Sequence, residues 1–239
     1  MLYVLAIGNS FSEDSTARLE SLGEGLYVRN LYIGGCSLER HYNNMISGEC
    51  AYHYQAFGCR LFNISLKEAL LQKKWDIITL QQVSGNSGIE DTFYPYLTEL
   101  KKYVKEYCPG AELRLHRTWA YAKGASHSAY SNYDNDHDKM WEAIKRTYDS
   151  ISKREDMKII PAGDLVQYLC TLPDFDPEKG GIPMHRDGYH LSRDYGRYAA
   201  SMVWRKELTG EISEVVPEDL DPEVCAVIRE ALRSQGAKK

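Results

Sequence analysis

The sequence predicts an α/β protein, a three-layer α/β/α flavodoxin-like sandwich built around a five-stranded parallel sheet. Apolar runs alternate along the chain with segments of helical periodicity, which is the pattern of parallel strands joined by crossover helices. The runs at residues 4–7 and 77–80 are continuous rather than alternating, as expected for strands that helices cover on both faces. No Pro-, Gly- or Ser-rich linker divides the 239 residues, so we expect a single domain over residues 1–239.

The expected elements follow from this alternation. The first apolar run has no basic region before it and leads directly into Gly8-Asn9-Ser10, which favours a strand over a signal peptide. The five expected strands cover residues 3–7, 26–33, 76–81, 112–116 and 158–161. The expected helices cover residues 14–24, 65–73, 94–107, 135–153, 164–169, 193–208 and 222–234. Residues 34–62 and 174–188 are read as two long loops, of which the first crosses the active face, because long loops in compact domains are often functional.

Composition excludes several classes of protein. The chain has 43% apolar and 26% charged residues and a formal net charge of −5, enough for a full core and without the basic cluster of a nucleic-acid-binding face. No apolar stretch approaches the roughly 20 residues that span a bilayer, so we expect neither nucleic acid nor membrane as partner. Six scattered cysteines without a Cys-x-x-Cys pair indicate reduced thiols and a cytoplasmic protein. A secreted protein that has lost its signal peptide would show the same features.

Ser10 is the first candidate catalytic residue. It stands between the first expected strand and a helical segment, where backbone N–H groups point outward and favour developing negative charge. Gly8 permits the tight turn. A serine at this position can equally be a helix N-cap, so the turn alone leaves nucleophile and cap both open.

A serine nucleophile needs a base, and the base needs a carboxylate that orients it. Near the end of the chain, Asp187-Gly188-Tyr189-His190 places a carboxylate three residues before a histidine, across a glycine turn. This spacing lets the carboxylate reach Nδ1–H while Nε2 faces outward. His190 is therefore the candidate base and Asp187 its orienting group.

Taken together, Gly8-Asn9-Ser10 after the first strand and Asp187-Gly188-Tyr189-His190 late in the chain resemble the SGNH, or GDSL-like, serine hydrolases. The resemblance covers nearly the whole chain, and residues 80–82, 116–121 and 187–192 resemble a poorly characterised bacterial branch. It implies Ser10 as nucleophile, His190 as general base and then acid, and Asp187 as orienter, with no metal and no cofactor. The implied oxyanion hole uses the Ser10 N–H, a glycine N–H after the second strand, for which we favour Gly34 over Gly35, and a side-chain amide after the third strand.

The third oxyanion donor departs from the family pattern. The usual Gly-x-Asn-Asp is absent, and Gln81-Gln82-Val83-Ser84-Gly85-Asn86 stands in its place. A glutamine amide also offers an uncharged N–H donor, and two consecutive strand residues point to opposite faces. We select Gln82, with Gln81 and Asn86 as alternatives, and a loop-bracing role for Gln82 also remains open. The first and third expected strands should be neighbours at the topological switch point, which would bring Ser10 and Gln82 together.

Two other kinds of site compete with this interpretation. An α/β-hydrolase elbow needs Gly-x-Ser-x-Gly, whereas Ser12 occupies the second glycine position. A metal site could use His185, Asp187 and His190 on one loop. The acidic run at residues 134–138 fails as an EF-hand because Lys139 replaces the turn glycine and Lys145 the bidentate glutamate.

Aromatic residues suggest the substrate. Many of the 18 tyrosines and 4 tryptophans fall in expected loops, and rings with polar edges suit sugars as well as acyl groups. We assign substrate binding to Trp119 and Tyr121. The sequence thus indicates a serine esterase that cleaves short acyl esters, with O-acetyl groups on carbohydrate or another small-molecule ester as substrate. A lipid esterase, a thioesterase and a catalytically inactive ligand-binding module of the same fold are the alternatives.

Overall fold

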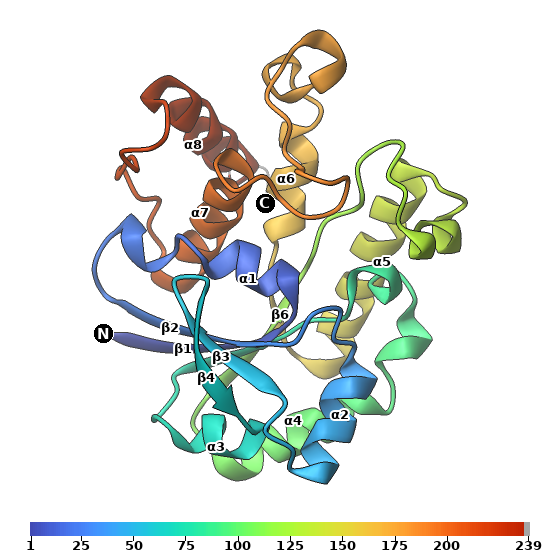
Figure 1. Ribbon diagram of the computed structural model, residues 1–239, viewed down its shortest axis with the longest axis vertical. Coiled ribbons are helices and arrows are strands. Elements are labelled where there is room, and N and C mark those ends of the chain that lie inside the picture. Colours follow the sequence, from blue (N-terminus) through green and yellow to red (C-terminus); the bar gives the residue numbers. More distant parts are fainter. Residues whose placement is uncertain (237–239) are drawn as a thin grey trace.

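The computed structural model describes residues 1–236, and its centre is a mostly parallel seven-stranded sheet (Figure 1). The strand order is β4-β3-β2-β1-β5-β6-β7. The strands are β1 (Leu2–Gly8), β2 (Leu26–Tyr32), β3 (Tyr52–Ala56), β4 (Cys59–Ile64), β5 (Ile77–Leu80), β6 (Glu112–His116) and β7 (Lys158–Ile160). The five expected strands are β2-β1-β5-β6-β7, all parallel. The expected number of five strands was wrong, because β3 and β4 extend the sheet as an antiparallel pair beside β2.

Helices cover both faces of the sheet, so the predicted three-layer arrangement is confirmed (Figure 1). The layer with α1 (Ser10–Thr16) also holds α6 (Ala162–Leu169), α7 (Tyr195–Thr209) and α8 (Pro222–Gly236). The opposite layer holds α2 (Leu38–Ser47), α3 (Leu66–Leu71), α4 (Tyr96–Tyr107) and α5 (His137–Glu155). The chain therefore leaves the carboxyl end of β1 toward one layer and reaches the neighbouring β5 from the other, which makes the β1/β5 edge a topological switch point.

The segment at residues 34–62 is largely ordered into regular elements, contrary to the expected loop. Ser37 caps α2 by accepting the N–H of Arg40 at 3.2 Å, and Gly48 ends the helix with φ of 69°. The β3/β4 hairpin turns at Phe57-Gly58, where φ is 52° and 70°, the geometry of a type I′ turn that usually carries Asn-Gly. The weak turn signal and the exposed, non-alternating β4 concealed this hairpin in the sequence.

The first helix begins earlier than expected. It starts at Ser10 instead of residue 14 because the Asn9 side chain accepts the N–H of Phe11 at 3.0 Å and so caps the helix. It ends at Thr16, and a separate 3-10 turn, Glu20–Leu22, fills the rest of the expected range. Ser10 consequently lies in the first turn of α1, directly after the sheet edge.

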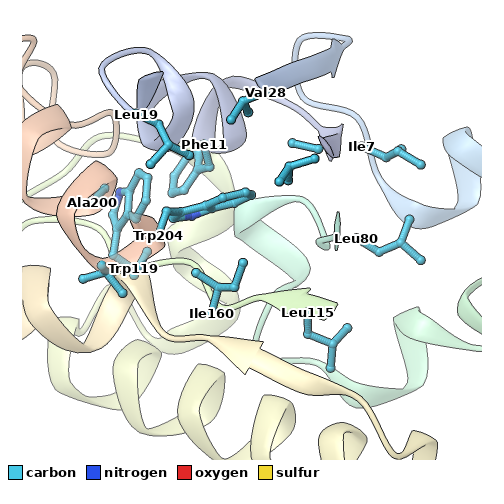
Figure 2. Close-up of a cluster of buried hydrophobic side chains, with 14 of the residues drawn as sticks. Ile7, Phe11, Leu19, Val28, Leu80, Leu115, Trp119, Ile160, Ala200 and Trp204 are labelled. Carbon is cyan, nitrogen blue, oxygen red and sulfur yellow. The ribbon is translucent and has the colours of Figure 1, made fainter. Parts of the chain in front are cut away.

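The core beneath this edge contains the aromatic side chains Phe11, Trp119 and Trp204 among aliphatic ones (Figure 2). Phe11 stacks on Trp119 with ring centroids 4.4 Å apart, and the His116 ring lies edge-on to Trp204 at 5.0 Å. All four side chains are at most 2% exposed. Burying a ring of this size typically stabilises a fold by about 1.5–3 kcal/mol, so this cluster fixes α1 and α7 against the sheet.

Candidate functional site

The turn that carries Ser10 is tightly constrained. A Cβ on Gly8 would lie 2.6 Å from Ser12 Oγ and 2.9 Å from Gln81 Cδ, so only glycine fits there. Asn9 is buried, and its Oδ1 accepts from Gln81 Nε2 at 2.6 Å while its Nδ2 donates to the carbonyl of Cys36 at 3.0 Å. The Asn9 side chain thus joins the ends of β1, β2 and β5 at one edge of the sheet.

The structure brings Ser10, His190 and Asp187 together. His190 Nε2 lies 2.8 Å from Ser10 Oγ, and His190 Nδ1 lies 2.7 Å from Asp187 Oδ2. The other Asp187 oxygen accepts the backbone N–H groups of His190 at 2.8 Å and Tyr189 at 3.2 Å. A carboxylate on Nδ1 favours the tautomer that has its proton there, which leaves Nε2 free to accept the Ser10 proton.

The environment of Asp187 favours its charged form. Burial alone would raise the pKa of Asp187, but the hydrogen bond from the His190 ring and those from the two backbone N–H groups outweigh it. The pKa of this carboxyl is therefore below its usual value. Asp187 is accordingly an anion at neutral pH, as an orienting group for an imidazole must be.

The glycine turn after β2 is exposed at the same edge. The Cys36 N–H donates to the carbonyl of Ile33 at 3.2 Å and closes the turn, in which Gly35 has φ of 59°. Among residues 1–236, neither Gly34 nor Gly35 uses its N–H in a hydrogen bond with another backbone group. Both N–H groups are therefore available to an external acceptor, and the bond from Asn9 to Cys36 holds the turn beside Ser10.

Gln82, the selected third donor, is engaged elsewhere. Its Nε2 donates to the carbonyl and hydroxyl oxygens of Thr92 at 2.9 and 3.2 Å. Its Oε1 accepts the backbone N–H groups of Leu38 at 3.0 Å and Val83 at 2.8 Å. The structure contradicts Gln82 as oxyanion donor, because both N–H groups of its amide are used and the side chain is 1% exposed.

The two alternatives named for this role differ from each other. Gln81 is also buried, with Nε2 bonded to Asn9 and Oε1 bonded to His116 Nδ1 at 2.7 Å. Asn86 is only partly buried, and within the described chain its side-chain amide makes no hydrogen bond. Asn86 is thus the one of the three residues whose amide is free to donate.

A cavity of about 290 Å³ adjoins this loop. Its lining comes from the start of α2, the loop after β5 and the segment before α4, and includes Ser37, Glu39, Asn86, Asp91, Tyr94 and Tyr96. Tyr96 donates its hydroxyl to Glu39 at 3.0 Å. The lining combines carboxylates, an amide and aromatic rings, and it contains no lysine or arginine.

Trp119 and Tyr121 cannot contact a substrate in this structure, because both side chains are completely buried. Trp119 stacks on Phe11, and its Nε1 donates to the carbonyl of Tyr189 at 2.8 Å (Figure 2). The Tyr121 hydroxyl lies 2.8 Å from Ser84 Oγ. The substrate-binding assignment of these two residues was wrong, since aromatic rings fill cores as readily as sites.

The metal hypothesis finds no support in the described structure. Within residues 1–236, no three His, Cys, Asp or Glu side chains are grouped so that they could hold a metal ion. His185 pairs with Leu191 across the hairpin, and burial lowers the pKa of its ring to about 4.

Among the described residues 1–236, no helix has the length and apolar character to cross a membrane.

Sequence reasoning missed Asp14. This carboxylate is completely buried and accepts hydrogen bonds from Arg186, Arg197 and the backbone N–H of Leu191. The sequence signal for it is its spacing of four residues from Ser10, which places both side chains on one face of a helix.

Comparisons with known proteins agree with the fold. The chain is 35% identical to a DUF4886 family protein from Bacteroides uniformis, and the two structures superpose with a TM-score of 0.88. This match covers 98% of the present chain and 93% of the Bacteroides uniformis protein. A candidate SGNH hydrolase from Slackia heliotrinireducens is 20% identical with a TM-score of 0.61, the match covering 86% and 97% of the two chains. The acetyl xylan esterase AlAXEase is 15% identical with a TM-score of 0.55, and the match covers 85% of the present chain and 98% of the esterase chain.

The two more distant likenesses show that this chain shares its fold with those two proteins. Among curated proteins, no sequence matches this chain. Residues 3–237 match the family described as "Domain of unknown function (DUF4886)". With this match and the 35% identity to the Bacteroides uniformis protein, the chain belongs to the DUF4886 family.

Proposed function

We propose that this protein is a serine esterase in which Ser10, His190 and Asp187 form the catalytic triad. The observation that carries the proposal is the pair of contacts at His190, 2.8 Å to Ser10 Oγ and 2.7 Å to Asp187 Oδ2. Both distances lie within the hydrogen-bond reach that a nucleophile, its base and the orienting group require.

The proposed reaction has two stages. Ser10 Oγ attacks the ester carbonyl carbon while His190 Nε2 takes the hydroxyl proton, and the tetrahedral intermediate then expels the alcohol, which receives that proton. Water next attacks the acyl-enzyme, again giving its proton to His190, and Ser10 recovers the proton as the carboxylic acid leaves. Asp187 keeps the imidazole oriented and stabilises its cationic form throughout.

The proposed oxyanion hole consists of the Ser10 N–H, the Gly34 N–H and the Asn86 side-chain amide. Gly34 lies in a turn with available N–H groups, and Asn86 has an amide free of other partners. Such donors act on the negative charge that develops in the transition state, where removal of one usually costs about 10²–10³-fold in kcat.

For the substrate we propose a short acyl ester of a polar alcohol, with acetylated carbohydrate as the class. The 290 Å³ cavity beside Asn86 has carboxylates that can accept from sugar hydroxyls and tyrosine rings that can pack on sugar C–H faces. A long acyl chain would instead need a continuous apolar groove. The structural similarity to an acetyl xylan esterase is consistent with this class.

The test has two parts. Wild-type protein should be labelled by a fluorophosphonate, and Ser10→Ala should not be; absence of labelling in the wild type would favour the inactive binding module. Acetylated xylo-oligosaccharides and p-nitrophenyl acetate should be cleaved with higher kcat/KM than p-nitrophenyl octanoate. A kcat/KM that rises steadily to the octanoate would reject the carbohydrate class and favour a lipid esterase or thioesterase.

A further inference from the structure

We propose that Asp14 is a positioning residue that holds the His190 loop in register with the nucleophile on α1. The inference rests on the proposed function, since it concerns the geometry of that triad. Asp14 touches none of the reacting groups; it acts through the segment that carries His190.

The first argument is the register of the contacts. Ser10 and Asp14 are four residues apart in α1 and so lie on one face of the helix, a turn apart. His190 and Leu191 are consecutive in the opposing loop. Ser10 meets the His190 ring at 2.8 Å, and Asp14 Oδ2 accepts the Leu191 N–H at 3.0 Å. Two adjacent contacts between the same two segments fix both the separation and the rotation of the loop.

The second argument is charge. Asp14 is completely buried, and its oxygens lie 3.0 and 3.1 Å from Arg186 Nη1, with Arg197 Nε 2.8 Å from Oδ1. Removal of one partner from a buried ion pair leaves an uncompensated charge and is strongly destabilising. The loop therefore cannot move away from α1 without separating Arg186 from Asp14.

The third argument is that Arg186 also organises the loop itself. Its backbone N–H donates to the carbonyl of His190 at 2.9 Å, and its guanidinium donates to the carbonyl of Leu191. Arg186 thus ties together both limbs of the turn that presents Asp187 and His190. Through Asp14, this turn is attached to the helix that carries Ser10.

The neighbouring carboxylate provides a matched control. Glu13 also contacts Arg197, at 3.3 Å, and accepts from Gln55 at 2.8 Å, but no hydrogen bond joins it to residues 184–192. A change at Glu13 therefore disturbs the same arginine and helix without touching the His190 loop.

The experiment compares Asp14→Asn with Glu13→Gln in the full chain, measuring thermal stability, kcat and KM for p-nitrophenyl acetate, and the fluorophosphonate labelling rate. A fourth readout is the downfield proton resonance of His190 Nδ1–H in its bond to Asp187. Because a displacement of about 1 Å can cost about 10²-fold in rate, Asp14→Asn should lower kcat and the labelling rate about 10–100-fold. Its KM should be unchanged and its Nδ1 proton resonance shifted or broadened. Glu13→Gln should match the wild type in kcat, KM, labelling rate and Nδ1 proton resonance.

Several results would overturn the inference. One is wild-type kcat and an unchanged Nδ1 resonance in Asp14→Asn; another is an equal loss of kcat in Glu13→Gln. If Asp14→Asn does not fold, Arg186→Lys decides, because lysine keeps a positive charge opposite the buried Asp14 carboxylate but lacks the guanidinium that bonds Asp14 and the Leu191 carbonyl together; it must then show the same fall in kcat at constant KM. A wild-type protein that neither reacts with fluorophosphonate nor cleaves esters would refute the proposed function, while the resonance would still report on the Asp14 contact.

Discussion

Gln82 directs its side-chain amide at Thr92, with Nε2 2.9 Å from the Thr92 carbonyl oxygen. At its other end, Oε1 accepts the N–H of Leu38, the first residue of α2. Gln82, the second residue after β5, therefore joins the start of α2 to the segment before α4, and it braces the loops around the site.

We expect Gln82→Ala to destabilise the protein. The change leaves the Leu38 N–H and the Thr92 carbonyl without their partner, and each buried polar group left unsatisfied costs about 1–3 kcal/mol. Urea denaturation followed by circular dichroism would measure the free energy of unfolding. A variant as stable as the wild type would contradict the bracing role.

Asn86→Ala should lower kcat for p-nitrophenyl acetate by about 10²–10³-fold with little change in KM, because the lost hydrogen bond forms only in the transition state. Stability should be nearly unchanged, since the amide has no partner within the described chain. Steady-state kinetics on folded protein would check this. If Asn86→Ala kept its kcat, the third donor would have to come from another group.

Asp187→Asn should reduce kcat by up to about 10⁴-fold, as in other triads where the imidazole then adopts the wrong tautomer. Ser10→Ala should abolish acyl-enzyme formation altogether. The two variants can be compared by burst kinetics and fluorophosphonate labelling. Near-normal turnover in Asp187→Asn would mean that a different carboxylate orients His190.

Trp119→Ala should act on stability and kcat rather than on substrate affinity. Removal of a fully buried indole typically costs about 3–5 kcal/mol, and it also removes the hydrogen bond to the Tyr189 carbonyl. Thermal unfolding and kinetics below the melting temperature would separate the two effects. A selective rise in KM for acetylated sugars at full stability would instead restore direct substrate contact.

Acidification should destabilise the fold below neutral pH. Burial lowers the pKa of His41 and of His116 to about 3, and that of His185 to about 4. In the unfolded chain these histidines take up protons near pH 6.5. The fold, which keeps them neutral, is therefore fully stable with respect to them above about pH 6.5, and it loses free energy of unfolding progressively as the pH falls toward their lowered pKa values. The free energy of unfolding should fall between pH 6.5 and 4, less steeply in His41→Gln. A pH-independent stability over this range would contradict the burial of neutral histidines.

The sequence was informative where local chemistry is decisive. Continuous apolar runs placed the five parallel strands, and the spacing of Asp187 and His190 across Gly188 anticipated their contact. The expected topological switch point predicted that the first and third expected strands are neighbours, and β1 does pair with β5.

The errors arose where tertiary contacts decide the role of a side chain. Whether Gln82 or Asn86 has a free amide depends on Thr92 and Leu38, which no local pattern connects to them. Burial of Trp119 depends on Phe11, which lies 119 − 11 = 108 positions earlier in the chain. Asp14 finds its partners more than 170 residues away, a distance at which sequence periodicity has no predictive power.

The contact between Ser10 and His190 spans 180 positions of the chain. During synthesis, β1 and the Ser10 turn leave the ribosome long before the loop that carries His190. In the proposed triad, Ser10 therefore has no base until the chain has been synthesised through residue 190 and that loop lies against α1. Under the proposed function, catalytic turnover consequently reports that the segments around Ser10 and His190 have assembled in the folded protein.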